Sequence, residues 1–227
     1  MDAKPLIRSF GRIKCRKLST TKEKLLSDLL IKYQINEDFL SKKTNYQNLA
    51  NNFKNIVLEI GSGFGDFVFA KAKAHPDNAF IACETHINGI VNLLAKLEKN
   101  PLNNIKIFNS DIRLLLNNIK YPLFDKIYIL FPDPWPKVRH YKRRLINEDF
   151  LESLNKVILN NGKLIIATDH DSYKSWILAK ILKNDSFKWT AVSKNDWQNF
   201  PEDWVHTKYQ KKAVKEGRSS IFLEFKK

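Results

Sequence analysis

Short apolar runs alternate with segments of helical spacing from residue 55 to the C-terminus. The apolar runs predict buried strands, because each is only a few residues long and several end at glycine or proline. These strands are expected at 56–60, 79–83, 105–108, 126–131 and 164–167. The segments that follow them predict helices at 67–74, 87–97, 112–119, 147–159 and 172–182. Such alternation is typical of an α/β fold, a doubly wound, mostly parallel sheet flanked by helices.

The two ends of the chain depart from this alternation. Residues 1–50 are polar and basic, with a helical pattern around Glu23–Tyr33, so we interpret them as a basic N-terminal extension. Residues 51–227 then form the folded domain. Near the C-terminus, 187–192 and 220–225 have strand character, and 193–217 is expected to be a loop region.

The composition of the chain predicts an anionic binding partner. Apolar residues make up 43% of the 227, yet no apolar run approaches the length that a membrane helix needs. The net charge of +15 favours nucleic acid, a membrane surface or a phosphorylated substrate. Arginine forms bidentate contacts with phosphate that lysine cannot copy, so its distribution is informative. Six of the eight arginines fall in two segments, at Arg8, Arg12 and Arg16 and at Arg139, Arg143 and Arg144.

Cysteine and histidine usage predicts no metal centre. Cys15 and Cys83 lie far apart, which argues against a disulfide framework and favours a reducing, cytoplasmic setting. His140 and His170 lack a third ligand at a suitable spacing, so we expect no bound metal. The N-terminal residues lack the apolar core of a secretory signal.

A glycine loop and a series of carboxylates follow the predicted strands. Glu59-Ile60-Gly61-Ser62-Gly63-Phe64-Gly65 ends the first strand, and Glu84, Asp111 and Asp133 follow the next three. The carboxyl ends of parallel strands meet at one edge of a sheet, where ligands bind. Asp66 stands where a dinucleotide fingerprint needs glycine or alanine, and a carboxylate there would repel a pyrophosphate. We therefore expect S-adenosylmethionine, with its cationic sulfonium and amino groups, with Glu84 accepting from the ribose hydroxyls and Asp111 from the adenine amino group.

A proline-dense loop follows the fourth strand. Residues 131–144 read FPDPWPKVRHYKRR, and each proline fixes φ and excludes helix. We expect a stiff, extended segment that holds Asp133 and Trp135 at the mouth of the sheet. The basic run that follows at once suggests an anionic substrate beside the cofactor.

This loop resembles the signature loop of the bacterial tRNA (guanine-N7)-methyltransferase family, whose members are class I S-adenosylmethionine-dependent enzymes with a Rossmann-like fold. The resemblance covers nearly the whole chain. It also includes Arg8-Ser9-Phe10, Glu59-Ile60-Gly61, Glu84-Thr85-His86, Thr168-Asp169 and Thr207-Lys208-Tyr209-Gln210. It implies transfer of a methyl group to N7 of a guanine in tRNA, expected at position 46 in the variable loop.

The resemblance also implies roles for individual residues, with Asp133 as the catalytic residue. Implied cofactor contacts are Glu59, Gly61, Gly63, Gly65, Glu84, Asp111 and Asp133. Implied substrate contacts are Lys137, Asp169, Thr207, Lys208, Tyr209 and Gln210. Implied RNA contacts are Arg139, His140, Tyr141, Lys142, Arg143 and Arg144, with Arg8, Arg12 and Arg16 in the N-terminal segment.

Three positions depart from the family pattern. Gln210 stands where the family usually has glutamate, Lys212-Ala213 replaces an expected Arg-Gly pair, and Cys15 stands where glycine is frequent. Gln210 can still accept a hydrogen bond, but the charge is lost.

Other functions stay open at this point. The main alternative is a non-catalytic RNA-binding protein that retains the methyltransferase fold. An exocyclic-amino methyltransferase is disfavoured because the loop reads Pro132-Asp133-Pro134-Trp135, and a nicotinamide oxidoreductase is disfavoured by Asp66. Either a monomer or a homodimer fits the sequence.

Overall fold

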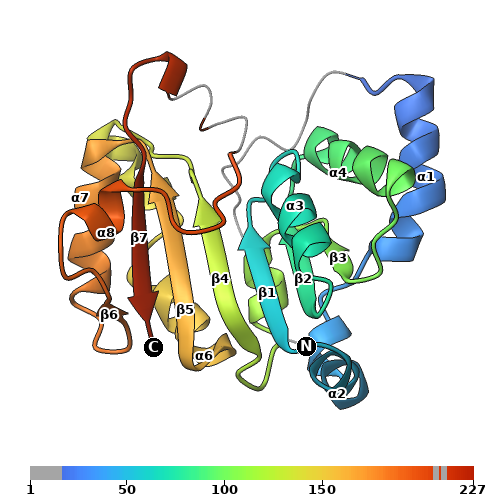
Figure 1. Cartoon of the computed structure of the whole chain (residues 1–227), viewed down its shortest axis with the longest axis horizontal. Coiled ribbons are helices and arrows are strands. Elements are labelled where there is room, and N and C mark those ends of the chain that lie inside the picture. Colours follow the sequence, from blue (N-terminus) through green and yellow to red (C-terminus); the bar gives the residue numbers. More distant parts are fainter. Residues whose placement is uncertain (1–16, 207–209, 211–213) are drawn as a thin grey trace.

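A seven-stranded sheet lies between two layers of helices in this computed structural model, which describes residues 17–206, 210 and 214–227 (Figure 1). The strand order is β3-β2-β1-β4-β5-β7-β6. Strand β7 is antiparallel to both of its neighbours, and the other pairs are parallel. The predicted doubly wound, mostly parallel sheet is therefore confirmed.

The strands are β1 Asn55–Ile60, β2 Asn78–Cys83, β3 Ile105–Phe108, β4 Phe124–Leu130, β5 Ile158–Thr168, β6 Lys188–Trp189 and β7 Ile221–Lys226. The α-helices of the described residues are α1 Thr20–Tyr33, α2 Lys43–Asn52, α3 Asp66–Ala74, α4 Ile87–Lys99, α5 Ile112–Leu116, α6 Glu148–Val157, α7 Asp171–Ile181 and α8 Asn195–Gln198. Two 3-10 segments are η1 Phe39–Ser41 and η2 Val138–Arg143.

Most predicted elements lie where the hydrophobic pattern puts them, and β5 differs most. It begins at Ile158, directly after α6, and runs through Gly162, which was expected to lie beyond the end of a helix. Phe124 pairs with Ile158 and Lys126 with Lys163, so the register shifts between the two pairs. Pairing with β4 therefore overrides the loop-like composition of Asn160–Gly162. The structure also contains η1, α2 and α8, which the pattern did not predict, and ends α5 at Leu116. The proline loop is not extended throughout as expected, because η2 forms after the last of its prolines.

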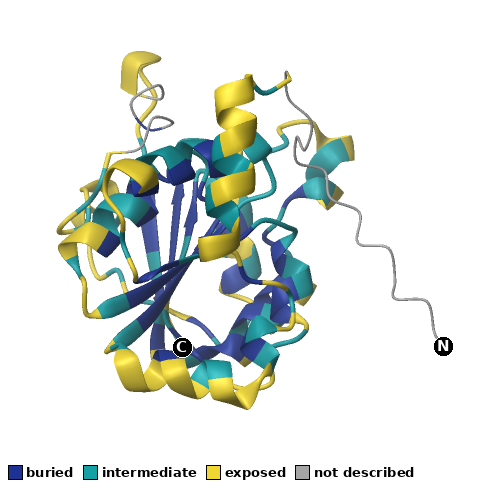
Figure 2. Ribbon diagram, turned by 90° about the vertical axis from the view of Figure 1, so that its right-hand side faces the viewer, coloured by how far each residue is buried: buried dark blue, intermediate teal, exposed yellow. Residues whose placement is uncertain are grey.

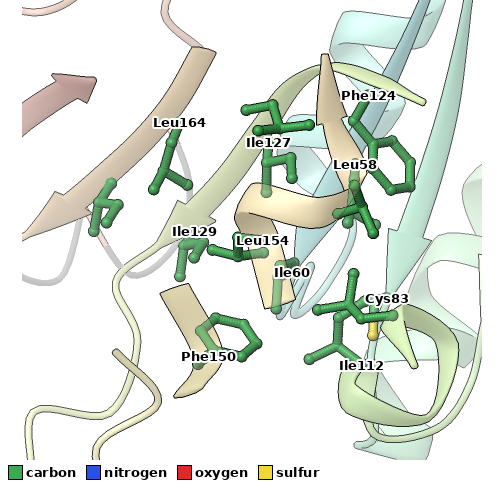
Figure 3. Packing of buried hydrophobic residues seen from close by; sticks show 14 of the residues in the cluster. Leu58, Ile60, Cys83, Ile112, Phe124, Ile127, Ile129, Phe150, Leu154 and Leu164 are labelled. Atoms are coloured by element: carbon green, nitrogen blue, oxygen red, sulfur yellow. The ribbon is translucent and has the colours of Figure 1, made fainter. Parts of the chain in front are cut away.

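Apolar side chains fill both faces of the sheet. Leu58 and Ile60 point toward the layer that contains α5, α6 and α7, whereas Val57 faces the layer of α1, α3 and α4. Figure 3 shows Phe150 and Leu154 of α6 packed near Ile129 of β4. Buried residues form the sheet and the inner faces of the helices, and exposed residues lie outside (Figure 2). This packing holds the strand ends rigidly at one edge.

Part of the predicted N-terminal extension belongs to this core. Helix α1 packs on α4, and Tyr33, Ile35, Leu40 and Leu49 are buried. The backbone of Ile35 donates to the carbonyl of Ile107, so this segment covers the outer edge of β3. Burial therefore joins residues 33–49 to the domain. Arg8, Arg12 and Arg16 lie outside the described residues.

Candidate methyl-transfer site

A cavity of about 1000 Å³ opens at the carboxyl ends of the parallel strands. Its wall contains the loops after β1, β2, β3 and β4 together with residues of η2 and α6. The strand order reverses beside β1, between β2 and β4, which is where ligands bind in open α/β sheets. Gly61, Gly63, Glu84, Asp111 and Asp133 all line the cavity, so the structure brings these predicted residues together.

The glycine loop adopts a backbone that favours glycine. Gly61, Gly63 and Gly65 have φ values of 76°, 54° and 68°, a region that L side chains rarely occupy. The loop also requires a glycine at position 89, in the first turn of α4. A Cβ at Gly89 would lie 2.3 Å from the carbonyl oxygen of Gly63. Gly89 was not predicted as part of the site, although a glycine inside a helical pattern often marks a close packing contact.

Glu84 ties the end of β2 to the glycine loop. One carboxylate oxygen accepts from the backbone N–H of Gly63 at 2.6 Å. The other accepts from the N–H groups of Thr85 and His86, each at 2.7 Å. A carboxylate has about four acceptor sites, so this arrangement leaves room for one more donor at the cavity.

Glu59 is placed differently from the other predicted cofactor contacts. Its side chain is 3% exposed and it is not among the residues that line the cavity. Burial raises the pKa of Glu59 well above its ordinary value, and a hydrogen bond from the backbone of Val68 opposes the shift only partly. The carboxyl group thus lies beneath the first turn of α3, where it accepts from the backbone of Val68. Its direct contact with the cofactor stays a prediction.

Asp111 and Arg113 form a bidentate pair at the end of β3. Oδ1 of Asp111 caps α5 by accepting from the backbone N–H of Arg113, and it also accepts from Nε at 2.9 Å. Oδ2 lies 2.7 Å from the second guanidinium nitrogen. The side-chain hydrogen bond to Asp111 is the main cause of the raised pKa of Arg113. Both residues line the cavity, and Arg113 was not predicted as part of the site.

The expected repulsion of a pyrophosphate by Asp66 is not supported by its surroundings. Asp66 does not line the cavity, and its carboxylate pairs with Lys96 at 2.8 Å. Lys96 also donates to the carbonyl oxygen of Phe64 at 2.5 Å. The pair instead fastens the glycine loop to α4, and the charge of Asp66 is largely compensated.

The proline loop holds Asp133 at the cavity between two strained residues. Asp133 is exposed and Trp135 is half-buried, and both line the cavity. Phe131 and Trp135 have positive φ values of 52° and 42°, which cost energy for side chains of this size. The backbone N–H of Phe131 donates to the carbonyl of Ala167 at 2.8 Å, so β5 anchors the start of the loop.

Aromatic contacts connect the proline loop to the basic residues after it. The guanidinium of Arg143 lies 5.0 Å from the centre of the Trp135 ring, and the His140 ring meets the edge of the same indole at 5.8 Å. Partial desolvation, and then the charges of Arg143, Arg139 and Lys137, lower the pKa of His140 from 6.5. Its imidazole is therefore neutral at pH 7.

The predicted RNA contacts differ widely in exposure. Lys137, Arg139 and Lys142 are exposed, whereas Tyr141 is half-buried against Trp176. Arg144 is only 2% exposed, so it does not belong to the basic surface that the sequence suggested. Its burial corrects the predicted RNA contacts. The sequence offered no reason to separate Arg144 from Arg139 and Arg143.

The remaining substrate candidates lie near the ends of β5 and β7. Oδ2 of Asp169 accepts from Nε of Arg218 at 2.8 Å. Gln210 is fully buried, and its Oε1 accepts from the indole N–H of Trp204 at 2.8 Å. Thr207, Lys208 and Tyr209 lie outside the described residues, as does Lys212-Ala213. Within the described ranges no cluster of metal-ligating side chains is found, and no helix is long and apolar enough to cross a bilayer.

Comparison with solved structures defines the class. A 16S ribosomal RNA methyltransferase, KamB, superposes with a TM-score of 0.60 at 14% identity, over 82% of this chain and 93% of its own. The Streptococcus mutans protein SMU.1697c, solved in complex with SAH, gives a TM-score of 0.51 at 10% identity, over 81% and 96% of the two chains. The fold is therefore that of class I, Rossmann-like methyltransferases.

Sequence relatives narrow this class further. The family model described as "Putative methyltransferase" matches residues 53–223. A tRNA (guanine-N(7)-)-methyltransferase of Agrobacterium fabrum is 33% identical over 216 residues, which cover 95% of this chain and 93% of the relative. The chain belongs to the tRNA (guanine-N7)-methyltransferase family.

The residues at the cavity fit the cofactor of that family. Glu84 and Asp133 present carboxylates to the cavity and complement a ligand that carries a sulfonium and an amino group. Asp111 also lines the cavity, but its charge is paired with Arg113. The close approach of Gly63 to Gly89 leaves backbone rather than side chain at the wall of the cradle.

Proposed function

We propose that this protein methylates N7 of guanine 46 in the variable loop of tRNA, with S-adenosylmethionine as the methyl donor. The observation that carries this proposal is one cavity lined by both the glycine loop and the strained proline loop, with an exposed basic segment directly after Asp133. The name of the Agrobacterium fabrum relative supports the substrate class. A cytoplasmic location agrees with this role.

The cofactor would be held by groups at the ends of β1, β2 and β3. Gly61, Gly63 and Gly65 would present their backbone to it, Glu84 would accept from the ribose, and Asp111 would accept from the adenine amino group. Glu59 would act through the start of α3, to which it is hydrogen-bonded at Val68. When bound, S-adenosylmethionine supplies an electrophilic methyl group on a sulfonium.

Methylation at guanine N7 needs little acid–base chemistry from the protein. N7 has a free lone pair and no proton, so positioning and charge placement are the main sources of catalysis. Asp133 would accept from the Watson–Crick edge of the guanine, orient N7 and stabilise the positive charge that develops on the base. Asp169 would help to hold the base, and Lys137 would contact a nearby phosphate.

The RNA itself would lie over the exposed basic residues beside the cavity. Lys137, Arg139 and Lys142 are exposed and suit phosphate contacts. Arg8, Arg12 and Arg16, and Thr207, Lys208 and Tyr209, remain predicted contacts for tRNA and its guanine. Gln210 is fully buried against Trp204 and would act by supporting that segment. Recognition of a structured RNA with one unstacked base requires both kinds of contact.

The test is methylation of unmodified total tRNA with labelled cofactor, followed by nucleoside analysis. We expect 7-methylguanosine, and we expect a tRNA transcript with adenine in place of guanine 46 to remain unlabelled. Absence of 7-methylguanosine would overturn the proposal. Calorimetric titration with S-adenosylmethionine separates the alternative, because an RNA-binding protein that merely retains the fold should not bind the cofactor.

A further inference from the structure

Arg144 is the buried member of the basic segment and sits in an aromatic cage. Its guanidinium carbon lies 3.7 Å from the ring centre of Tyr141, 5.0 Å from that of Trp176 and 5.1 Å from that of Tyr173. The side chain is 2% exposed. Rings on several sides compensate part of the cost of removing a cation from water. Arg144 is among the residues that line the cavity, but almost none of its surface is exposed, so a phosphate outside the protein has little of the guanidinium to contact.

The hydrogen bonds of Arg144 connect the proline loop to helix α7. Nε donates to the carbonyl oxygen of Pro134 at 2.8 Å, and a terminal nitrogen donates to Oγ of Ser172 at 3.1 Å. Pro134 directly follows Asp133 and precedes Trp135, whose φ is 42°. Arg144 therefore contacts the backbone between the proposed catalytic residue and a strained residue. Through Ser172 it also joins the loop to the start of α7.

We propose that Arg144 is a positioning residue that fixes the Pro132–Trp135 backbone, and with it the carboxylate of Asp133, and that it does not contact RNA. The proposal rests on the proposed function, since it concerns the placement of Asp133 over the guanine. Among the described residues no carboxylate forms an ion pair with Arg144. Its charge is thus used in the cage and in the bond to the loop carbonyl.

Lysine cannot replace arginine in this arrangement. The planar guanidinium stacks on Tyr141 while Nε and a terminal nitrogen donate in two fixed directions. An ammonium group is more strongly hydrated and lacks the Nε donor, so the Pro134 carbonyl would lose its partner. Arg144→Lys therefore keeps the charge and removes the geometry, which separates the two roles.

The experiment compares Arg144→Lys and Arg144→Gln with Arg139→Gln, an exposed arginine of the same segment. For each variant we measure kcat, the tRNA dissociation constant across a salt series, and the melting temperature. Both Arg144 variants should lose about 100-fold in kcat, because a misplaced catalytic group has an effect of this size. The dependence of their tRNA affinity on salt concentration should equal that of the wild type. Arg139→Gln should instead weaken tRNA binding and reduce the slope by about 0.7–0.9.

A wild-type kcat in Arg144→Lys with weaker, less salt-dependent tRNA binding would overturn the proposal. If the Arg144 variants do not melt cooperatively, Ser172→Ala decides, because Ser172 is exposed and its hydroxyl contributes one hydrogen bond to Arg144 and one to Nδ1 of the neighbouring His170. It should lower kcat several-fold, with recovery in Ser172→Thr; an unchanged kcat there rejects the role. Failure of the wild-type enzyme to form 7-methylguanosine would instead count against the proposed function.

Discussion

The guanidinium of Arg218 holds the carboxylate of Asp169, with Nε of Arg218 2.8 Å from Oδ2. Because Asp169 follows β5 and Arg218 precedes β7, this hydrogen bond joins the ends of the two strands. Arg218 also pairs with Glu216 of its own segment. The hydrogen bond to Asp169 is the main cause of the raised pKa of Arg218. The pair orients the carboxylate of Asp169, the residue proposed to help hold the guanine.

Loss of Arg218 should weaken substrate binding without abolishing the fold. We expect Arg218→Gln to raise the KM for tRNA several-fold, because Asp169 loses the group that orients it. Lys215→Gln removes one charge from the same exposed segment and should have a smaller effect. The measurement is a double-mutant cycle with Asp169→Asn. Additive effects of the two substitutions would show that the pair does not act as a unit.

Asp133→Asn should lose turnover far more than cofactor affinity. The amide keeps the shape but cannot stabilise a positive charge on the base, so we expect about a 100- to 1000-fold loss of the single-turnover rate. Asp149→Asn is the matched control, because Asp149 is an exposed carboxylate lining the same cavity. A similar loss in both variants, or retained turnover in Asp133→Asn, would contradict the assigned role.

Gly89→Ala should reduce the affinity for S-adenosylmethionine. The added Cβ would lie 2.3 Å from the carbonyl oxygen of Gly63, so the glycine loop must shift. Overpacking of this kind costs about 1–3 kcal/mol, which corresponds to a dissociation constant raised about 5- to 150-fold if the whole cost falls on binding. Alanine is the better helix former, so propensity works against this outcome. Calorimetric titration measures it, with Glu98→Ala on the exposed part of α4 as the control.

Glu59→Gln should make the stability of the protein less dependent on pH. The folded-state pKa of Glu59 lies above the unfolded value of 4.5, so its contribution is fully present below pH 4.5 and is lost as pH rises through the folded pKa. Glutamine has no such loss and can still accept from the backbone of Val68. The melting temperature of the variant, relative to wild type, should therefore increase with pH.

Melting curves between pH 5 and pH 8.5 measure this difference, and each 1 kcal/mol corresponds to about 2–4 °C for a chain of this size. Glu98→Gln, an exposed glutamate, provides the control and should follow the wild type at every pH. A Glu59→Gln curve parallel to wild type would show that the buried carboxyl group is not destabilised when it ionises.

Periodicity predicted β1, β2, β3 and β4 within a few residues, because short apolar runs buried on both faces are typical of parallel strands. It also predicted that Glu84, Asp111 and Asp133 converge, since parallel strand ends meet at one edge. The pattern could not predict the part of β5 that precedes Gly162, because this part forms by pairing of Ile158 with Phe124 on the neighbouring strand β4. Nor could it predict that residues 33–49 belong to the folded domain. Their burial depends on contact with the outer edge of β3, which lies much further along the chain.

The sequence by itself determined the fold class, the glycine loop and the residue types at the strand ends, because these follow from local periodicity and from the shared edge of parallel strands. Only the tertiary structure decided which of three neighbouring arginines is buried, that Gly89 makes room for Gly63, and that Arg113 and Arg218 hold Asp111 and Asp169. Burial and pairing depend on which distant side chains meet. For Arg144 those are Tyr173 and Trp176, on a helix about 30 residues further along the chain.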